Sequence, residues 1–74
     1  MSRLPTLSSS KLIKILEKAG FHVQRQKGSH TYLKHPDRRA TVVPLHKGED
    51  IGRGLLRKIL RDIRVEPEDF QKML

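Results

Sequence analysis

The centre of the 74-residue sequence reads QKGSHTY over residues 26–32, and this stretch predicts a β-hairpin. Gly28 can adopt the positive φ that a short hairpin turn requires, and Ser29 is common beside it. Residues 31–33 (Thr-Tyr-Leu) favour an extended backbone. We therefore expect His30 at the first position of a strand that runs to about His35.

Side chains alternate between the two faces of a strand, so His30, Tyr32 and Lys34 are expected on one face. Thr31, Leu33 and His35, which alternate with them, are expected on the other face. An imidazole, a phenol and an ammonium group would then share one surface, which is a plausible place to handle a phosphodiester. A histidine at the start of a strand is more often a solvated surface residue, so the interpretation of His30 depends on the rest of the chain.

Two further strands are predicted on either side of this one. The first covers about residues 21–26, with Phe21 and Val23 facing inward and Arg25 at the end of their row. The turn at residues 36–39 leads to a strand over about residues 40–43. Three short consecutive strands with tight turns predict an antiparallel meander.

The first helix is predicted to begin at Ser8 as its N-cap, after a loose tail over residues 1–6. Gly20 is expected as the left-handed residue that follows its last turn. Its buried stripe is predicted from the i, i+3, i+4, i+7 spacing of Leu12, Ile15, Leu16 and Ala19.

A loop over residues 45–50 leads to a second helix, predicted over about residues 52–63. A last helical turn begins at Glu66-Pro67, because proline is well tolerated at the first helical position. The inward residues of that turn are expected to be Phe70, Met73 and Leu74. The order α-β-β-β-α predicts an α+β domain, residues 1–74, with helices on one face of the sheet and the other face open.

The composition favours an anionic partner. The chain has 16 Lys and Arg against 8 Asp and Glu, giving a net charge of +8, and a pI near 10.5. Residues 1–40 hold nine of these cations and two acids, a net +7, so the positive field centres on the first helix and the hairpin. The sequence contains no cysteine, signal peptide or membrane-spanning apolar run, which fits the cytoplasm.

His30 is the strongest candidate for chemistry because imidazole can give or take a proton near neutral pH. RNA carries its own nucleophile, the 2′-hydroxyl, so one positioned base or acid with nearby cations could cleave it without a metal. The cations expected within reach are Arg25, Lys27, Lys34 and Lys47. The four histidines lack metal-ligand spacing, and no glycine loop for a cofactor phosphate is present.

An ordered set of residues resembles the HicA toxin family (YcfA-like), from about Ser8 to Phe70. The matching positions are Lys11-Leu12-Ile13, Leu16, Gly20-Phe21, Arg25, Gly28-Ser29-His30, Tyr32, Val43-Pro44 with His46, Leu55, Ile59-Leu60 and Phe70. The resemblance implies a fold like that of a double-stranded-RNA-binding domain, and an mRNA interferase that a HicB antitoxin neutralises.

The resemblance also assigns roles to residues. The histidine of the Gly-Ser-His motif, His30, would be catalytic, and His46 stands in the family's Pro-x-His motif. Together with the hairpin cations, the expected RNA-binding residues are Arg25, Lys27, Gly28, Ser29, Tyr32, Lys34, His46 and Lys47. Two alternatives remain: a non-catalytic RNA-binding module with the same fold and, ranked lower, a DNA-binding accessory protein.

Overall fold

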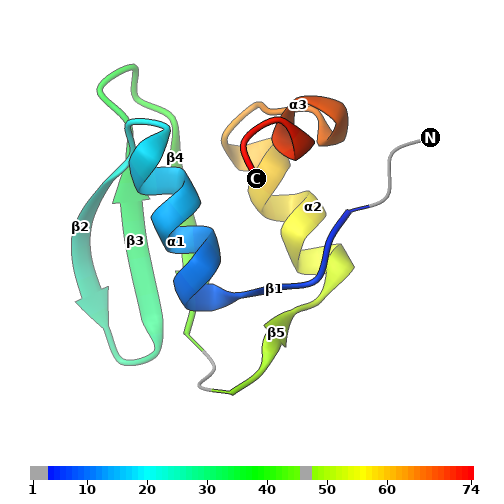
Figure 1. The fold of residues 1–74 in the computed structure, drawn as a ribbon. Helices are drawn as coiled ribbons and strands as arrows, with labels where there is room; N and C mark the ends of the chain where they lie inside the picture. The colour runs from blue at the N-terminus through cyan, green and yellow to red at the C-terminus, as the bar shows by residue number, and fades with distance from the viewer. Residues whose placement is uncertain (1–3, 46–47) are drawn as a thin grey trace.

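The computed structural model describes residues 4–45 and 48–74. The elements are β1 (Leu7–Ser8), α1 (Ser9–Lys18), β2 (His22–Lys27), β3 (His30–Lys34), β4 (Ala40–Pro44), β5 (Asp50–Ile51), α2 (Arg53–Asp62) and α3 (Pro67–Gln71) (Figure 1). Apart from the short strands β1 and β5, this is the predicted order α-β-β-β-α with a final helical turn. The α+β class is confirmed.

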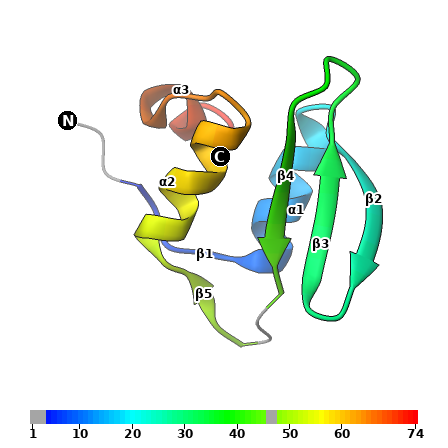
Figure 2. The same cartoon turned by 180° about the vertical axis from the view of Figure 1, so that it is seen from behind.

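Strands β2, β3 and β4 form the predicted antiparallel meander. Helix α1 lies across one face of this sheet, and α2 packs against β4 (Figures 1 and 2). The helix face holds buried Thr31 and Leu33 of β3, which pair with buried Val43 and Thr41 of β4. Tyr32 is on the opposite face and is half-buried. No described helix lies across that face of the sheet (Figure 2). The sheet therefore has one covered and one open face, as predicted.

Helix α1 begins and ends as its sequence predicts. The Ser8 side chain accepts a hydrogen bond from the Lys11 backbone N–H at 3.2 Å, which satisfies one of the free donors of the first turn. At the other end, Gly20 has φ +100°, and the Phe21 N–H returns to the Leu16 carbonyl at 3.0 Å. This Schellman pairing turns the chain toward β2 and buries Phe21. Ala19, expected in the buried stripe, is the C-cap residue and is exposed.

The N-terminal segment differs from the prediction of a loose tail. Leu4 is only 4% exposed, and Leu7–Ser8 pair with Asp50–Ile51 as a two-stranded antiparallel sheet. A pair of two-residue strands leaves no alternating pattern to recognise, and its residues lie far apart in the sequence. Asp50, the last residue of the loop predicted over residues 45–50, therefore belongs to strand β5. Residues 1–3 of the predicted tail lie outside the described part.

The core fills the space between the helices and the sheet. Its buried apolar side chains are Leu4, Leu7, Leu12, Ile15, Leu16, Phe21, Leu33, Val43, Ile51, Leu56, Ile59, Leu60, Ile63 and Phe70. Val23, predicted to face inward, is 43% exposed because it lies on β2, an edge strand. Leu74 is also exposed, contrary to expectation, whereas Met73 packs against the core. None of the helices among the described residues is long and apolar enough to cross a lipid bilayer.

A polar cluster at the β3–β4 turn fixes the end of α2 to the sheet. The Arg39 guanidinium donates to the Ile63 carbonyl at 2.6 Å and to the Asp37 carboxylate at 2.8 Å. The backbone N–H of Arg39 also donates to that carboxylate, and this bond is the main reason that the pKa of Asp37 lies below its ordinary value. The His35 ring stands edge-on to Phe21, with centroids 5.1 Å apart. Arg39 of the turn thus donates a hydrogen bond to the carbonyl at the end of α2, and His35 packs against the core residue Phe21.

Gly20 provides the first test of this arrangement. A Cβ built on Gly20 would lie 2.8 Å from His35 Nε2, and its positive φ is unfavourable for any residue with a side chain. Gly20→Ala is therefore expected to lower the free energy of unfolding by about 2 kcal/mol. The matched control is Gly54→Ala in α2, where a Cβ meets nothing within 4 Å.

The control should raise the stability by up to about 1 kcal/mol, because alanine favours a helix more than glycine does. Urea denaturation followed by circular dichroism measures both variants. Equal effects of the two substitutions would contradict the close contact between Gly20 and His35.

Candidate functional site

The Gly-Ser-His stretch forms the hairpin that the sequence predicts. Lys27 and His30 are the last cross-strand pair, so Gly28 and Ser29 alone make the turn. Gly28 has φ +58°, whereas Ser29 is not among the described residues with positive φ. A glycine at the first of two central positions is typical of a type II′ turn, which suits the twist of paired strands. The turn therefore fixes where His30 begins its strand.

His30 is exposed, but its backbone is held on both sides. It pairs with Lys27 of β2 and with Pro44 of β4. The Leu45 backbone N–H donates to the Ser29 carbonyl and extends the pairing past the last residue of β4. The buried Ser9 hydroxyl at the start of α1 donates to the Pro44 carbonyl at 2.7 Å. The His30 imidazole is therefore accessible, while hydrogen bonds hold the backbone beneath it in place.

Ser9 is a supporting residue that the sequence does not reveal. It stands among three consecutive serines, and only Ser8 carries a recognisable signal, that of an N-cap. The tertiary contact of Ser9 with Pro44 joins residues 35 positions apart. Neither spacing nor residue type distinguishes it from Ser10, which is exposed.

A β-bulge places Arg25 on the same face as His30. The pairing register shifts between Val23 and Arg25, so that Arg25 lies opposite Tyr32. Cross-strand partners point to the same side of a sheet, so Arg25 joins the open face. Its guanidinium lies 4.6 Å from the centroid of the Tyr32 ring, within the range of a cation–π contact. The predicted inward row of Phe21, Val23 and Arg25 is therefore wrong at Arg25, because strict alternation ignores the extra residue.

The predicted site residues do not all come together. Lys27 is directly opposite His30, and Tyr32 with Arg25 follows next along the open face. Lys34 is on that face too, but it lies four positions along β3 from His30, or about 13 Å. Lys34 belongs to the far end of the strand, opposite His22 and Ala40. His46 and Lys47, also predicted site residues, lie outside the described residues.

The two strands of the hairpin carry basic side chains and no acidic ones. The sequence contains neither Asp nor Glu between Glu17 and Asp37. Asp37 itself is engaged by Arg39 at the opposite end of β3. Arg25 and Lys27 are exposed beside His30, so their positive charge faces solvent. In the described part of the chain, no three His, Asp or Glu side chains are grouped to hold a metal ion.

The hairpin therefore presents three chemical capabilities on one face. The His30 imidazole can transfer a proton, the Lys27 ammonium can stabilise negative charge beside it, and the Arg25–Tyr32 pair offers a flat cationic surface. Unpaired nucleobases stack on aromatic rings and on guanidinium planes. This combination suits a phosphodiester that is flanked by accessible bases.

Comparison with known proteins gives the chain a family. A search of curated proteins finds no match. The family model described as "HicA toxin of bacterial toxin-antitoxin" matches residues 9–65, which is more than half of the chain. The match spans α1, the whole three-stranded sheet and α2, and it includes the Gly28–His30 hairpin. The chain belongs to the HicA family of toxins from bacterial toxin–antitoxin systems.

Proposed function

We propose that this toxin is an mRNA interferase, an endoribonuclease that cleaves RNA through His30. One observation carries the proposal: an exposed imidazole on a fixed backbone stands directly opposite a lysine, on strands β2–β4 that contain no Asp or Glu. The family match supports a toxin role, and the net charge of +8 supports an anionic target. We also propose that it acts in the cytoplasm, where mRNA is found.

The proposed reaction uses the nucleophile that RNA supplies. A 2′-hydroxyl oxygen forms a bond to the adjacent phosphorus, and the bond from phosphorus to the 5′-oxygen of the next nucleotide breaks. His30 either removes the proton of the 2′-hydroxyl or donates one to the departing oxygen. Lys27 and Arg25 stabilise the negative charge that grows on the phosphate oxygens. The products are a 2′,3′-cyclic phosphate and a 5′-hydroxyl end.

The Arg25–Tyr32 pair would hold a base next to the reacting phosphate. Tyr32 is two residues from His30 on the same face, a separation of about 7 Å along the strand. Tyr32 is half-buried, and Arg25 covers part of its ring. A base stacked there would orient the chain of the RNA across the imidazole. Lys34 would contact a phosphate farther along the same strand.

A toxin of this family implies an antitoxin, and we propose a HicB-like protein that covers the hairpin. His30 and its neighbouring cations are exposed, so no described segment of the toxin blocks access of RNA to them. An acidic or mixed partner surface placed over Lys27 and Arg25 would exclude RNA by charge and by bulk. Such a partner would protect RNA in proportion to the amount of complex formed.

Product analysis tests the proposed chemistry. Purified toxin is expected to cleave single-stranded RNA equally with and without EDTA, since the nucleophile belongs to the substrate. DNA of the same sequence, which lacks the 2′-hydroxyl, should remain intact. Mass spectrometry of the RNA fragments should find a 2′,3′-cyclic phosphate paired with a 5′-hydroxyl.

The competing interpretation, a non-catalytic RNA-binding module, predicts that RNA is bound and recovered whole. Cutting of the DNA strand would contradict attack by the 2′-hydroxyl, and loss of RNA cleavage on chelation would contradict a reaction that needs no metal.

A further inference from the structure

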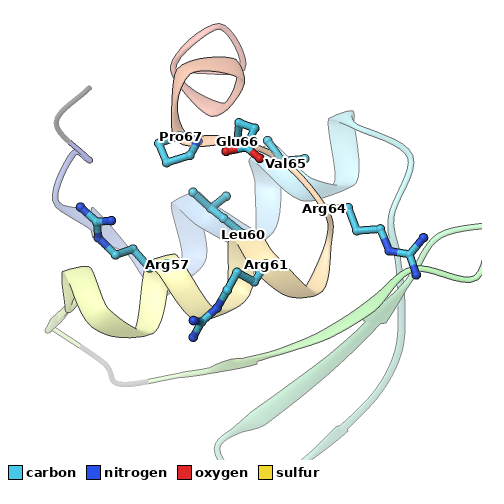
Figure 3. Close-up of a pocket in the computed structure, with 7 residues that line it drawn as sticks. All are labelled: Arg57, Leu60, Arg61, Arg64, Val65, Glu66 and Pro67. Atoms are coloured by element: carbon cyan, nitrogen blue, oxygen red, sulfur yellow. The ribbon is translucent and has the colours of Figure 1, made fainter. Parts of the chain in front are cut away.

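A second feature lies on the other side of the molecule from the hairpin. Helix α2 and the segment that follows it enclose a pocket of ≈ 510 Å³ (Figure 3). Its lining residues are Arg57, Leu60, Arg61, Arg64, Val65, Glu66 and Pro67. The lining runs from α2 to the start of α3. The C-terminal end of α2 lies toward the end of the sheet that carries the β3–β4 turn (Figures 1 and 2). The His30 hairpin is at the opposite end, so the two surfaces are separate.

The floor of the pocket is preformed and mostly apolar, with the Glu66 side chain between Val65 and Pro67 (Figure 3). Leu60 points from α2 toward the segment that carries Val65 and Pro67 (Figure 3). That segment is fixed because the Val65 N–H returns to the Leu60 carbonyl at 3.0 Å. The return requires Arg64 at φ +57°, a conformation in which glycine is the usual residue. Arginine is strained at this position, and its side chain forms no hydrogen bond or ion pair within the described part of the chain.

The rim of the pocket carries three arginines whose side chains form no ion pair within the described part of the chain. Arg57 and Arg61 are one turn apart on α2, about 6 Å along its axis, and Arg64 follows just after the end of the helix. Their guanidinium groups extend in three different directions, away from the gap between Leu60 and Pro67 (Figure 3). By contrast, Lys58 on the same helix pairs with Asp62 at 3.2 Å. The three arginines outnumber Glu66, the one acid of the lining, so the pocket would suit an extended ligand with separate negative charges.

We infer that this arginine pocket binds an acidic peptide segment of a protein partner, one whose carboxylates flank an apolar side chain. The carboxylates match the three guanidinium groups, and the apolar side chain covers Leu60, Val65 and Pro67. The sugar-phosphate backbone of RNA offers the charges but not an aliphatic group to place on that floor. Bound there, the peptide leaves His30 accessible, so the inference stands independently of RNA cleavage.

A synthetic peptide with one leucine between aspartates and glutamates serves as the probe. In two-dimensional NMR of the full-length protein, it should shift the amide signals of residues 57–67 and leave those of residues 25–34 in place. The double charge reversal Arg57→Glu/Arg61→Glu should weaken binding about tenfold, since two exposed attractions become repulsions. The matched control is Arg53→Glu, on the same helix but outside the pocket lining, and it should weaken binding much less.

The apolar floor is tested through the peptide, which avoids disturbing the core of the protein. Replacing its leucine by serine should weaken binding several-fold, because the apolar contact is lost. The double variant changes the net charge twice as much as Arg53→Glu does. If Arg53→Glu lost half or more of what the double variant loses on a logarithmic scale, binding would follow net charge alone and the inference would be overturned. It would also be overturned if single-stranded RNA displaced the peptide from residues 57–67, because the surface would then bind nucleic acid.

Discussion

His30→Ala is expected to lower the rate of RNA cleavage by about 10²–10⁴-fold, the usual effect of removing a general acid or base. The change in unfolding free energy should stay within about 0.5 kcal/mol, since the His30 side chain is exposed and outside the core. RNA affinity should also remain close to that of the unaltered protein, because Lys27 and Arg25 provide the charge. Initial cleavage rates on a labelled RNA measure the effect, and growth inhibition in cells should disappear with them.

The matched control is His22→Ala. His22 is exposed on the same open face, at the far end of β2 opposite Lys34. It offers the same imidazole away from the hairpin turn, so its removal should leave the cleavage rate nearly unchanged. If folded His30→Ala protein cut RNA at the original rate, the catalytic assignment of His30 would be wrong. Equal losses in the two variants would indicate a general effect of surface histidines on RNA binding.

The elements that the sequence predicts well are those whose signals are local. The Ser8 cap, the Gly20 C′ residue and the Gly28 turn each depend on a few adjacent residues. The sequence predicts helix α2 over about residues 52–63, and Gly52 and Ile63 are its cap residues. In each case the backbone preference and the apolar spacing indicate the same element, so it can be predicted without knowing the tertiary contacts.

The sequence fails where distant segments meet. The pairing of Leu7–Ser8 with β5 and the bond from Ser9 to Pro44 join parts of the chain more than 30 residues apart. Neither leaves a periodic pattern. The bulge before Arg25 is equally hidden, because one extra residue reverses every later side chain without changing the composition of the strand. This affects the site directly: strict alternation puts Arg25 on the helix face, whereas the register puts it beside Tyr32.

The arginine pocket shows the same limit. Arg57 and Arg61 fall on the polar face of an amphipathic helix, a pattern most often seen on a simple solvated surface. Only the return of the chain at Arg64 and Val65 turns this face into a pocket. The return is hard to predict because a non-glycine residue occupies the left-handed position, where sequence reasoning expects glycine.

RNA binding through the hairpin should be strongly salt-dependent. If five phosphates are neutralised, the affinity for single-stranded RNA should fall with a log–log slope of about −3.5, or about 3,000-fold for a tenfold rise in salt. The net +7 on residues 1–40, and the exposed Arg25 and Lys27 on the open face, are the reason for this expectation. Fluorescence anisotropy with a 2′-O-methyl RNA, which cannot be cleaved by its own hydroxyl, measures binding alone.

Single substitutions then locate the phosphates. Lys27→Gln removes one cation opposite His30 and should make the slope shallower by about 0.7. Lys72→Gln is the matched control: its side chain is 82% exposed just after α3, away from the hairpin, so the slope should stay the same. A flat dependence on salt would contradict electrostatic binding altogether. Equal changes in both variants would mean that RNA responds to the net charge of the protein and does not bind at the hairpin, and His30 would then lose the positioned substrate that its proposed role requires.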